Sequence, residues 1–436
     1  MIANHNPLYE NHSAPFNVRA ADTRNYATQY AGLYFSRLAL LRPKAFKTAS
    51  EIWKGSRIVD RVLDIQGGDG ESVIIAGTVF MDMPLKPCIL DVVAKEAWVT
   101  APPPRVKYTS DKDKVLLEDE SGRLELVGAP IDTGFLVSGV VVAVRGYENE
   151  NNQFHVQDIC FPRYQIEHPI PTIEEDTFVA FVSGLSVGPN FALSLELQLL
   201  MDYLTGEAGS VSDQASIASI CRVVVVGNSL EKKTISESSY AAGSMTKNSG
   251  ETYSPSSLTW LDNLFSQLCS SVHVDVMPGS EDATNYALPQ YAMPSGLFPK
   301  TRGFSSFQSV SNPYCASIGG VRLLGTSGQT IDDIYRYVDA EDRMAMVERT
   351  LRWGHMAPTA PDTLACYPFQ DADPFIIDKH PNLYFIGNQP EFGTKLSVGP
   401  LGETTRIVLV PSFSKTKTIA LVNLRTLDCH KVSFKQ

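Results

Sequence analysis

Four apolar runs of this chain each end in a turn that contains glycine, and this repeated pattern constrains the fold more than any other feature. The runs are Phe178–Ser183, Arg222–Gly227, Val272–Gly279 and Asn382–Gly387. Apolar strands that alternate with helical stretches are typical of a layered α/β domain. Ligands of such domains bind at the carboxyl ends of the strands, so the four turns are the first place to look for functional side chains.

The turns lack the residue types that a two-metal phosphoesterase site requires. Such a site needs Asp, His and Asn ligands, and a carboxylate must bridge the two cations because they repel one another. The corresponding positions hold Ser183, Leu185, Asn228, Ser280, Glu281, Asn388 and Pro390, and His355 is the only histidine in a comparable context. Leucine and proline cannot bind a metal, and neutral serine and asparagine do not offset its charge. We therefore predict no metal, cofactor or catalytic residue in this chain.

One alternative is a residual metal-dependent phosphoesterase or nuclease. Its ligands would be the remaining acids near the turns, Glu231, Glu281 and Asp282, together with His355. These side chains would have to converge within about 2–2.5 Å of shared ions.

A second alternative is a serine hydrolase. Residues 184–188 read Gly-Leu-Ser-Val-Gly, the G-x-S-x-G pattern of a nucleophile elbow, and they lie between a predicted strand and a predicted helix. Ser186 would be the nucleophile, Asp282 or Asp362 the acid and His380 the base. Five-residue patterns of this kind are common by chance, and we expect a tight turn at Ser186 instead.

The domain organisation follows from changes in composition along the chain. We predict a flexible N-terminus over residues 1–20 and a helical segment over 21–56, with its helix at 23–41 ended or bent by Pro43. A β-domain follows over 57–165. An α/β domain occupies 172–436, with a flexible, Ser- and Thr-rich insertion at 231–256.

The β-domain shows about five short apolar stretches separated by turn residues. They are Ser72–Phe80, Val115–Leu117, Leu124–Val127, Phe135–Val144 and Phe154–Ile159. This spacing predicts a small barrel of the oligonucleotide-binding (OB) type. Residues 57–165 hold 11 Lys and Arg against 17 Asp and Glu, a local charge of -6. We therefore expect this barrel to bind protein or to be structural, since DNA-binding barrels carry basic grooves.

The spacing of apolar residues predicts further helices and strands in the α/β domain. A helix is expected from about residue 190 to 205, capped by Gly206, and another over 257–269. The glycine-rich segment 325–333 lacks a Walker lysine, so we expect a turn that enters a helix near Ile331. A second sheet is predicted from later apolar runs, namely Val321–Leu324, Tyr384–Ile386, Arg406–Val410 and Thr418–Asn423.

Charge and cysteine content exclude some classes of protein. The formal net charge of -11 opposes DNA binding by the chain as a whole, because phosphates repel an acidic surface. The seven cysteines form no CxxC pair, which argues against a zinc or iron–sulfur site made by this chain. No apolar stretch approaches the roughly 18 residues of a membrane span, and we predict no membrane contact.

Longer segments carry a specific resemblance to a known family. They include 274–279 (Val-Asp-Val-Met-Pro-Gly), 351–364 (Leu-Arg-Trp-Gly-His-Met-Ala-Pro-Thr-Ala-Pro-Asp-Thr-Leu), 384–390 (Tyr-Phe-Ile-Gly-Asn-Gln-Pro) and 199–206 (Leu-Leu-Met-Asp-Tyr-Leu-Thr-Gly). Together they resemble the small (B) subunit of eukaryotic DNA polymerase delta, and the resemblance extends from about Tyr26 to the end of the chain. The chain departs from the family pattern at 280–283 and 291–294, which leaves contacts at those turns open.

The resemblance implies an α+β multidomain fold, with an OB-fold barrel attached to a calcineurin-like metallophosphoesterase α/β sandwich that has lost its metals. Archaeal members of the family retain the ligands and act as nucleases. The resemblance further implies a non-catalytic scaffold in DNA replication and repair in the nucleus.

Its implied partners are the cysteine-rich C-terminal module of the catalytic subunit, which carries the iron–sulfur or zinc site, and a third accessory subunit. DNA polymerase zeta is a further implied partner, and DNA would be reached indirectly through the complex.

Overall fold

The computed structural model describes residues 7–18, 25–65, 71–87, 105–131, 134–164, 173–189, 194–208, 214, 217–231 and 253–434. The chain forms two compact units. The sandwich unit comprises Met1–Arg24, His168–Gln329 and Pro381–Gln436, and the barrel unit comprises Asn25–Glu167 and Thr330–His380. Most of the predicted insertion at 231–256 lies outside the described residues.

The first sheet of the sandwich unit has a parallel core. Its strands, in spatial order, are β11 (Phe307–Ser309), β10 (His273–Met277), β9 (Ile220–Val226), β8 (Phe178–Val182), β17 (Thr418–Asn423) and β18 (Cys429–Ser433). The strands β11, β10, β9 and β8 are parallel, whereas β17 and β18 are antiparallel additions. Three of the four opening runs therefore lie side by side in one sheet, and their turns meet at one edge.

The second sheet mixes parallel and antiparallel pairs. Its order is β1 (Tyr9–Asn11), β12 (Tyr314–Ile318), β13 (Val321–Thr326), β14 (Leu383–Gln389), β16 (Thr404–Pro411) and β15 (Gly393–Val398). The prediction of a second sheet is confirmed for three of its four runs. Thr418–Asn423 is the exception, because it pairs with β8 of the first sheet. The prediction of a flexible 1–20 is also wrong at Tyr9–Asn11, which pair with β12.

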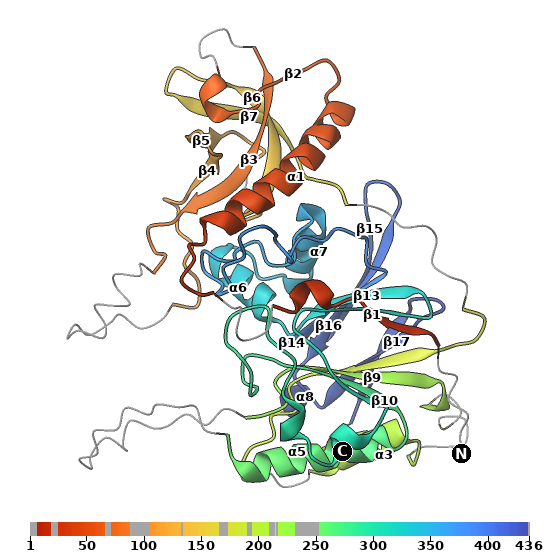
Figure 1. The fold of residues 1–436 in the computed structure, drawn as a ribbon. Helices are drawn as coiled ribbons and strands as arrows, with labels where there is room; N and C mark the ends of the chain where they lie inside the picture. The colour runs from red at the N-terminus through yellow and green to blue at the C-terminus, as the bar shows by residue number, and fades with distance from the viewer. Residues whose placement is uncertain are drawn as a thin grey trace, which may run out of the picture. The chain divides into compact units, whose positions relative to one another are not determined.

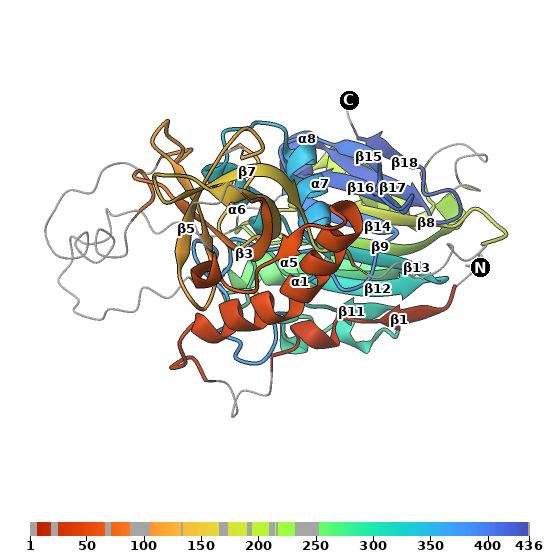
Figure 2. The ribbon, with the colours of Figure 1, turned by 90° about the horizontal axis from the view of Figure 1, so that it is seen from above.

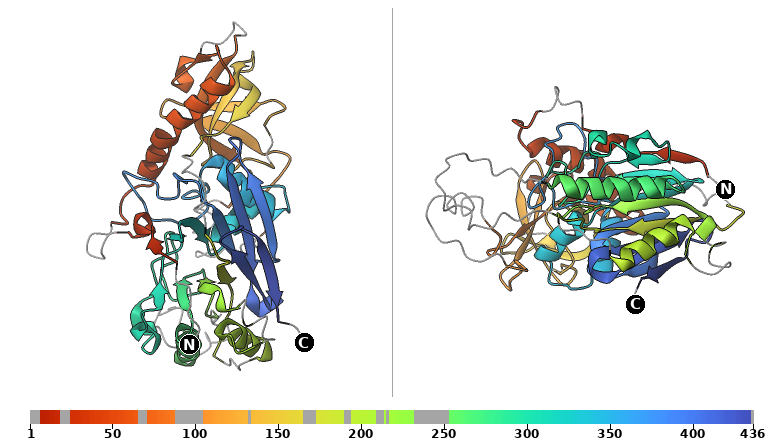
Figure 3. Two further views of the ribbon diagram at one scale, coloured as in Figure 1. Left: turned by 90° about the vertical axis from the view of Figure 1, so that its right-hand side faces the viewer. Right: turned by 90° about the horizontal axis from the view of Figure 1, so that it is seen from below.

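The two sheets of the sandwich unit pack face to face, as the alternation along each strand requires. Val224 and Val226 of β9 face the second sheet, whereas Val223 and Val225 face the helices on the other side. Those helices are α3 (Leu195–Thr205) and α5 (Pro255–Cys269), which lie on the outer face of the first sheet (Figure 3). α8 (Phe413–Thr416) is a single turn after β16.

The barrel unit contains a closed sheet (Figure 1). Its strands are β2 (Arg57–Ile58), β3 (Val73–Asp82), β4 (Lys114–Glu118), β5 (Arg123–Val127), β7 (Gln153–Cys160) and β6 (Val141–Glu148), in that order, and an additional β3–β6 pairing closes the barrel. The five predicted strands are all present. However, the run Phe135–Val144 becomes strand only from Val141, because Gly139 adopts a φ of 90° and turns the chain before it.

Helix α1 (Ala31–Ile52) lies across the barrel strands (Figure 2). It begins later than predicted and continues through Pro43 to Ile52. The prediction that the helix ends at Pro43 is therefore wrong. Pro43 lacks the N–H that would bond to the carbonyl of Ala39. The helix continues because its buried face, with Leu41 before the proline and Ala45 and Ala49 after it, packs against the barrel.

Two further helices are α6 (Gln329–Tyr337) and α7 (Arg343–Trp353). α6 confirms the predicted turn into a helix near Ile331. Residues 330–380 form contacts mainly with the barrel, so the compact units divide the chain differently from the predicted boundary at 172. Among the described residues, no helix has the length and apolarity needed to cross a membrane.

Candidate functional site

The candidate site lies in the sandwich unit, where the turns after β8, β9 and β10 meet the end of β14 from the second sheet. The turns contact one another through their backbones. Gly184 N–H donates to the carbonyl of Gly227 at 2.9 Å, and Ser186 N–H donates to that of Asn228 at 3.1 Å. A Cβ added to Gly279 would lie 2.2 Å from Asn228 Oδ1, so only glycine permits this approach. The four runs are therefore brought together as the sequence predicts.

Ser183 and Asn388 link the first sheet to the second. Ser183 is fully buried, its Oγ lies 3.1 Å from the carbonyl oxygens of both Val410 and Pro411, and it accepts the Asn388 N–H at 2.9 Å. Asn388 Nδ2 donates to the carbonyls of Val226 at 3.1 Å and Ser327 at 2.8 Å. Both side chains stand where a phosphoesterase would place metal ligands, and here they form hydrogen bonds between strand ends.

Asn228 performs the same role between β9 and β10. Its backbone has a φ of 53°, which asparagine tolerates better than other non-glycine residues. Its Oδ1 accepts the Glu281 N–H at 3.2 Å and lies 3.4 Å from Ser280 Oγ. Asn228 Oδ1 therefore accepts hydrogen bonds from both Ser280 and Glu281.

Asp282 is the buried acid of the site. Its carboxylate accepts backbone N–H groups from Leu230 at 2.9 Å and from Gly279 at 2.8 Å. Burial raises the pKa of this carboxyl to about 6, although these and neighbouring backbone N–H groups oppose the shift. Asp282 thus holds the β10 turn in place, and its oxygens point at amides of the protein.

The remaining positions offer little to a cation. Leu185 packs against the apolar cluster beneath α3 and α5, and Pro390 and Glu231 are exposed. Within the described parts of the chain, no group of three or more His, Cys, Asp or Glu residues could hold a metal ion. The observed donor set therefore does not fit a two-metal centre.

His355 lies in the barrel unit, not with the turns of the sandwich unit. Its Nε2 lies 2.8 Å from Asp373 Oδ2, and its Nδ1 accepts the Ala357 N–H at 3.2 Å. Because Nδ1 is an acceptor, the ring is neutral with its proton on Nε2. Burial and the nearby Arg37 guanidinium lower the pKa of His355, although Asp373 opposes them.

The partner of His355 belongs to a buried cluster that sequence reasoning missed. Arg37 of α1 is fully buried and donates Nε–H to Asp373 Oδ2 at 2.7 Å. The same guanidinium donates to the carbonyls of Gly139, Pro358 and Ala360. Burial disfavours the charge of Asp373, but Arg37 and His355 hold its pKa below the ordinary value. A charged residue on the apolar face of α1 was the only signal for this cluster.

The serine hydrolase arrangement is not assembled. Ser186 adopts a φ of 51°, and Ser414 Oγ is its hydrogen-bonding side chain at 3.3 Å. Asp362 pairs with Lys86, and the ring of His380 packs on Tyr164 with a centroid distance of 5.6 Å. Among the described residues, none of the histidines bonds to Ser186 Oγ.

Comparisons with known proteins show the family of the chain. The family of the B subunits of DNA polymerase alpha/epsilon matches residues 179–394, and the DNA polymerase delta subunit OB-fold domain matches residues 29–159. The second match covers α1 and the barrel, and the first covers the turns of the candidate site.

Relatives align over nearly the whole chain. The DNA polymerase delta small subunit of Arabidopsis thaliana is 42% identical, over 93% of this chain and 91% of its own length. DNA polymerase delta subunit 2 of Drosophila melanogaster is 34% identical, over 98% and 97%. The DNA polymerase II small subunit of Methanothermobacter thermautotrophicus is 24% identical over 65% of this chain. The chain belongs to the family of small, accessory subunits of DNA polymerase delta.

Proposed function

We propose that this chain is the non-catalytic scaffold of a DNA polymerase delta complex and that it bridges the C-terminal cysteine-rich module of the catalytic subunit and a third subunit. We further propose that the sandwich unit is a calcineurin-like phosphoesterase fold without metals. The same scaffold would serve replication and repair in the nucleus, would pair with polymerase zeta as well, and would reach DNA through the complex.

The observation that carries the proposal is the use made of the predicted ligand positions. Ser183, Asn228 and Asn388 donate and accept hydrogen bonds between strand ends, and Asp282 binds backbone amides. A catalytic site presents such groups to a substrate, whereas here Ser183 Oγ, Asn228 Oδ1 and Asn388 Nδ2 form hydrogen bonds that hold the strand ends together. This arrangement supports a scaffold that functions through the contacts of its surface with partner subunits and not through chemistry at the strand ends.

Co-expression tests the bridging role. The full chain should co-elute with the isolated C-terminal module of a polymerase delta catalytic subunit, and the pair should recruit the third subunit. A stable complex should bury more than roughly 2,000 Å² of surface. Separate elution of the chain and the module at micromolar concentration would refute the proposal.

An activity assay tests the alternative of a residual phosphoesterase. The full chain with Mn²⁺ should not hydrolyse a phosphodiester or single-stranded DNA above the background of the His355→Ala variant. Hydrolysis that this substitution removes would restore the enzyme hypothesis. Labelling by a fluorophosphonate that is lost in Ser186→Ala would do the same for the hydrolase.

A further inference from the structure

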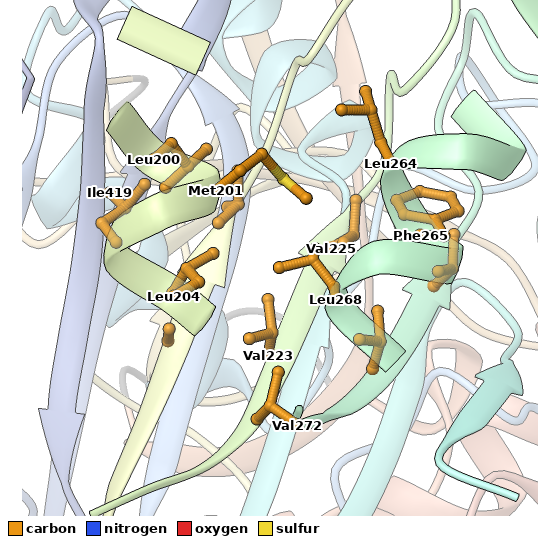
Figure 4. Close-up of a cluster of buried hydrophobic side chains, with 14 of the residues drawn as sticks. Leu200, Met201, Leu204, Val223, Val225, Leu264, Phe265, Leu268, Val272 and Ile419 are labelled. Atoms are coloured by element: carbon orange, nitrogen blue, oxygen red, sulfur yellow. The ribbon is translucent and has the colours of Figure 1, made fainter. Parts of the chain in front are cut away.

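The two helices on the outer face of the first sheet leave an open groove between them. The groove has a volume of about 110 Å³ and is lined by Gln198, Met201, Asp202, Trp260, Asn263, Leu264 and Gln267. Met201 and Leu264 form its floor, and both are at least 95% buried. Figure 4 shows Met201 on α3 and Leu264 on α5, the two helices that border the groove. None of these residues takes part in the candidate site.

The size of the groove matches a side chain and exceeds that of a packing defect. An engineered apolar cavity of about 150 Å³ holds a benzene molecule, so about 110 Å³ accommodates a branched aliphatic group. The wall includes Trp260, whose side chain is 39% exposed although it is large and apolar. Tryptophans in this setting, surrounded by polar rims, are characteristic of binding hot spots. The rim here is formed by three amides, Gln198, Asn263 and Gln267.

The charge of the groove selects among partners. Asp202 is the charged residue in the lining, and helices α3 and α5 contain no Lys or Arg between their ends. Glu196, in the first turn of α3, adds acid to the same helix. On the α5 side, Lys300 Nζ donates to Asn263 Oδ1 at 2.6 Å. The α3 wall therefore presents a carboxylate beside an apolar floor.

We propose that the α3–α5 groove docks a segment of a protein partner that places one aliphatic side chain next to a Lys or Arg. The aliphatic group fills the space over Met201 and Leu264 and packs on Trp260. The basic group pairs with Asp202, and the rim amides bond to the backbone of the segment. This docking site is additional to the scaffold role and does not depend on it.

Panning of a random 12-residue peptide library on the full chain tests the proposal. Bound peptides should share an aliphatic residue flanked by Lys or Arg. Gln198→Trp fills the groove from an exposed position and should abolish binding, whereas Thr259→Trp, at an exposed position of α5 outside the groove, should not. Asp202→Lys should weaken binding about tenfold or more and shift the selection toward Asp or Glu. The same charge change in Glu207→Lys is the matched control.

Three results would overturn the proposal. The first is a library that yields no peptide sensitive to Gln198→Trp, as expected if a segment of this chain already covers the groove. The second is a consensus that Asp202→Lys leaves unchanged. The third is a dimer of the free chain, detected by light scattering, that Gln198→Trp dissociates, which would make a second copy the occupant. Thermal melts of each variant would verify that the sandwich unit remains folded.

Discussion

At the scale of single residues, the fully buried Arg37 guanidinium is bonded to Asp373 and to three carbonyl groups. Removing one member of a buried ion pair leaves the other charge without compensation. The uncharged side chains at the strand ends play a similar part. Ser183 and Asn388 bond to backbone groups that would otherwise be buried without partners.

Arg37→Leu should lower the free energy of unfolding by about 3–5 kcal/mol, because it leaves the buried Asp373 carboxylate without its positively charged partner. Urea unfolding of the full chain measures the change. The control is Arg61→Leu, because its ion pair with Asp64 is about half exposed on both sides and is screened by solvent, so this variant should lose far less stability. Equal losses in the two variants would contradict the assignment.

His355 should make the protein less stable in acid. Its pKa is lowered in the folded state, so the unfolded chain binds the proton more readily. The stability that His355 contributes is therefore complete above the unfolded pKa of about 6.5 and declines below it, by at most about 1.4 kcal/mol per pH unit. Unfolding free energies of the wild type and His355→Gln, compared from pH 7.5 to 5, should converge or cross as the pH falls. The same comparison for His430→Gln, at an exposed position, is the control.

At the scale of elements, a local capping signal correctly predicted where α3 ends. Gly206 ends α3 with a φ of 81°, and its N–H caps the helix as the sequence predicts. The start of α1 and its passage through Pro43 were not predicted, because they depend on burial against the barrel. The early strand β1 was also missed, since three residues have no periodicity and form a strand only by pairing with β12.

Gly206→Ala should destabilise the sandwich unit by about 1 kcal/mol, because alanine is strained in the left-handed conformation. Gly296→Ala is the matched control, since its Cβ would enter open space and its φ is not positive. Chemical denaturation of the two variants distinguishes them. A loss at Gly296 as large as that at Gly206 would remove the role assigned to the cap.

At the scale of the whole molecule, the candidate site is built from strands that are distant in sequence. Residues 183 and 388 are 205 positions apart and are bonded directly. Because residues that cannot bind a metal are spread over all four turns, no single substitution supplies a binding set. This distribution separates the chain from an enzyme that has lost one catalytic group.

Asn228→Asp should therefore not create a metal site. Leu185 offers no atom that can bind a metal, and Ser183 Oγ is bonded to carbonyl groups. One added carboxylate therefore leaves too few ligands to hold a cation. Titration calorimetry with Mn²⁺ should give no saturable heat up to millimolar concentration. Asn149→Asp, in a barrel turn, adds the same charge elsewhere and serves as the control. Stoichiometric binding by Asn228→Asp alone would show that the remaining ligands are in place.

The sequence by itself determined the short apolar runs, and with them the strands β3, β9 and β17, and it also determined which side chains stand at the strand ends. Both follow from short-range rules: the length and composition of an apolar run and the chemistry of a turn. Only the tertiary structure decided that Ser183 reaches Asn388, that Thr418–Asn423 joins the first sheet, and that His355 lies with Arg37 in the barrel unit. The physical reason is that these outcomes depend on which buried polar groups find partners across long stretches of chain, and a local pattern does not encode that choice.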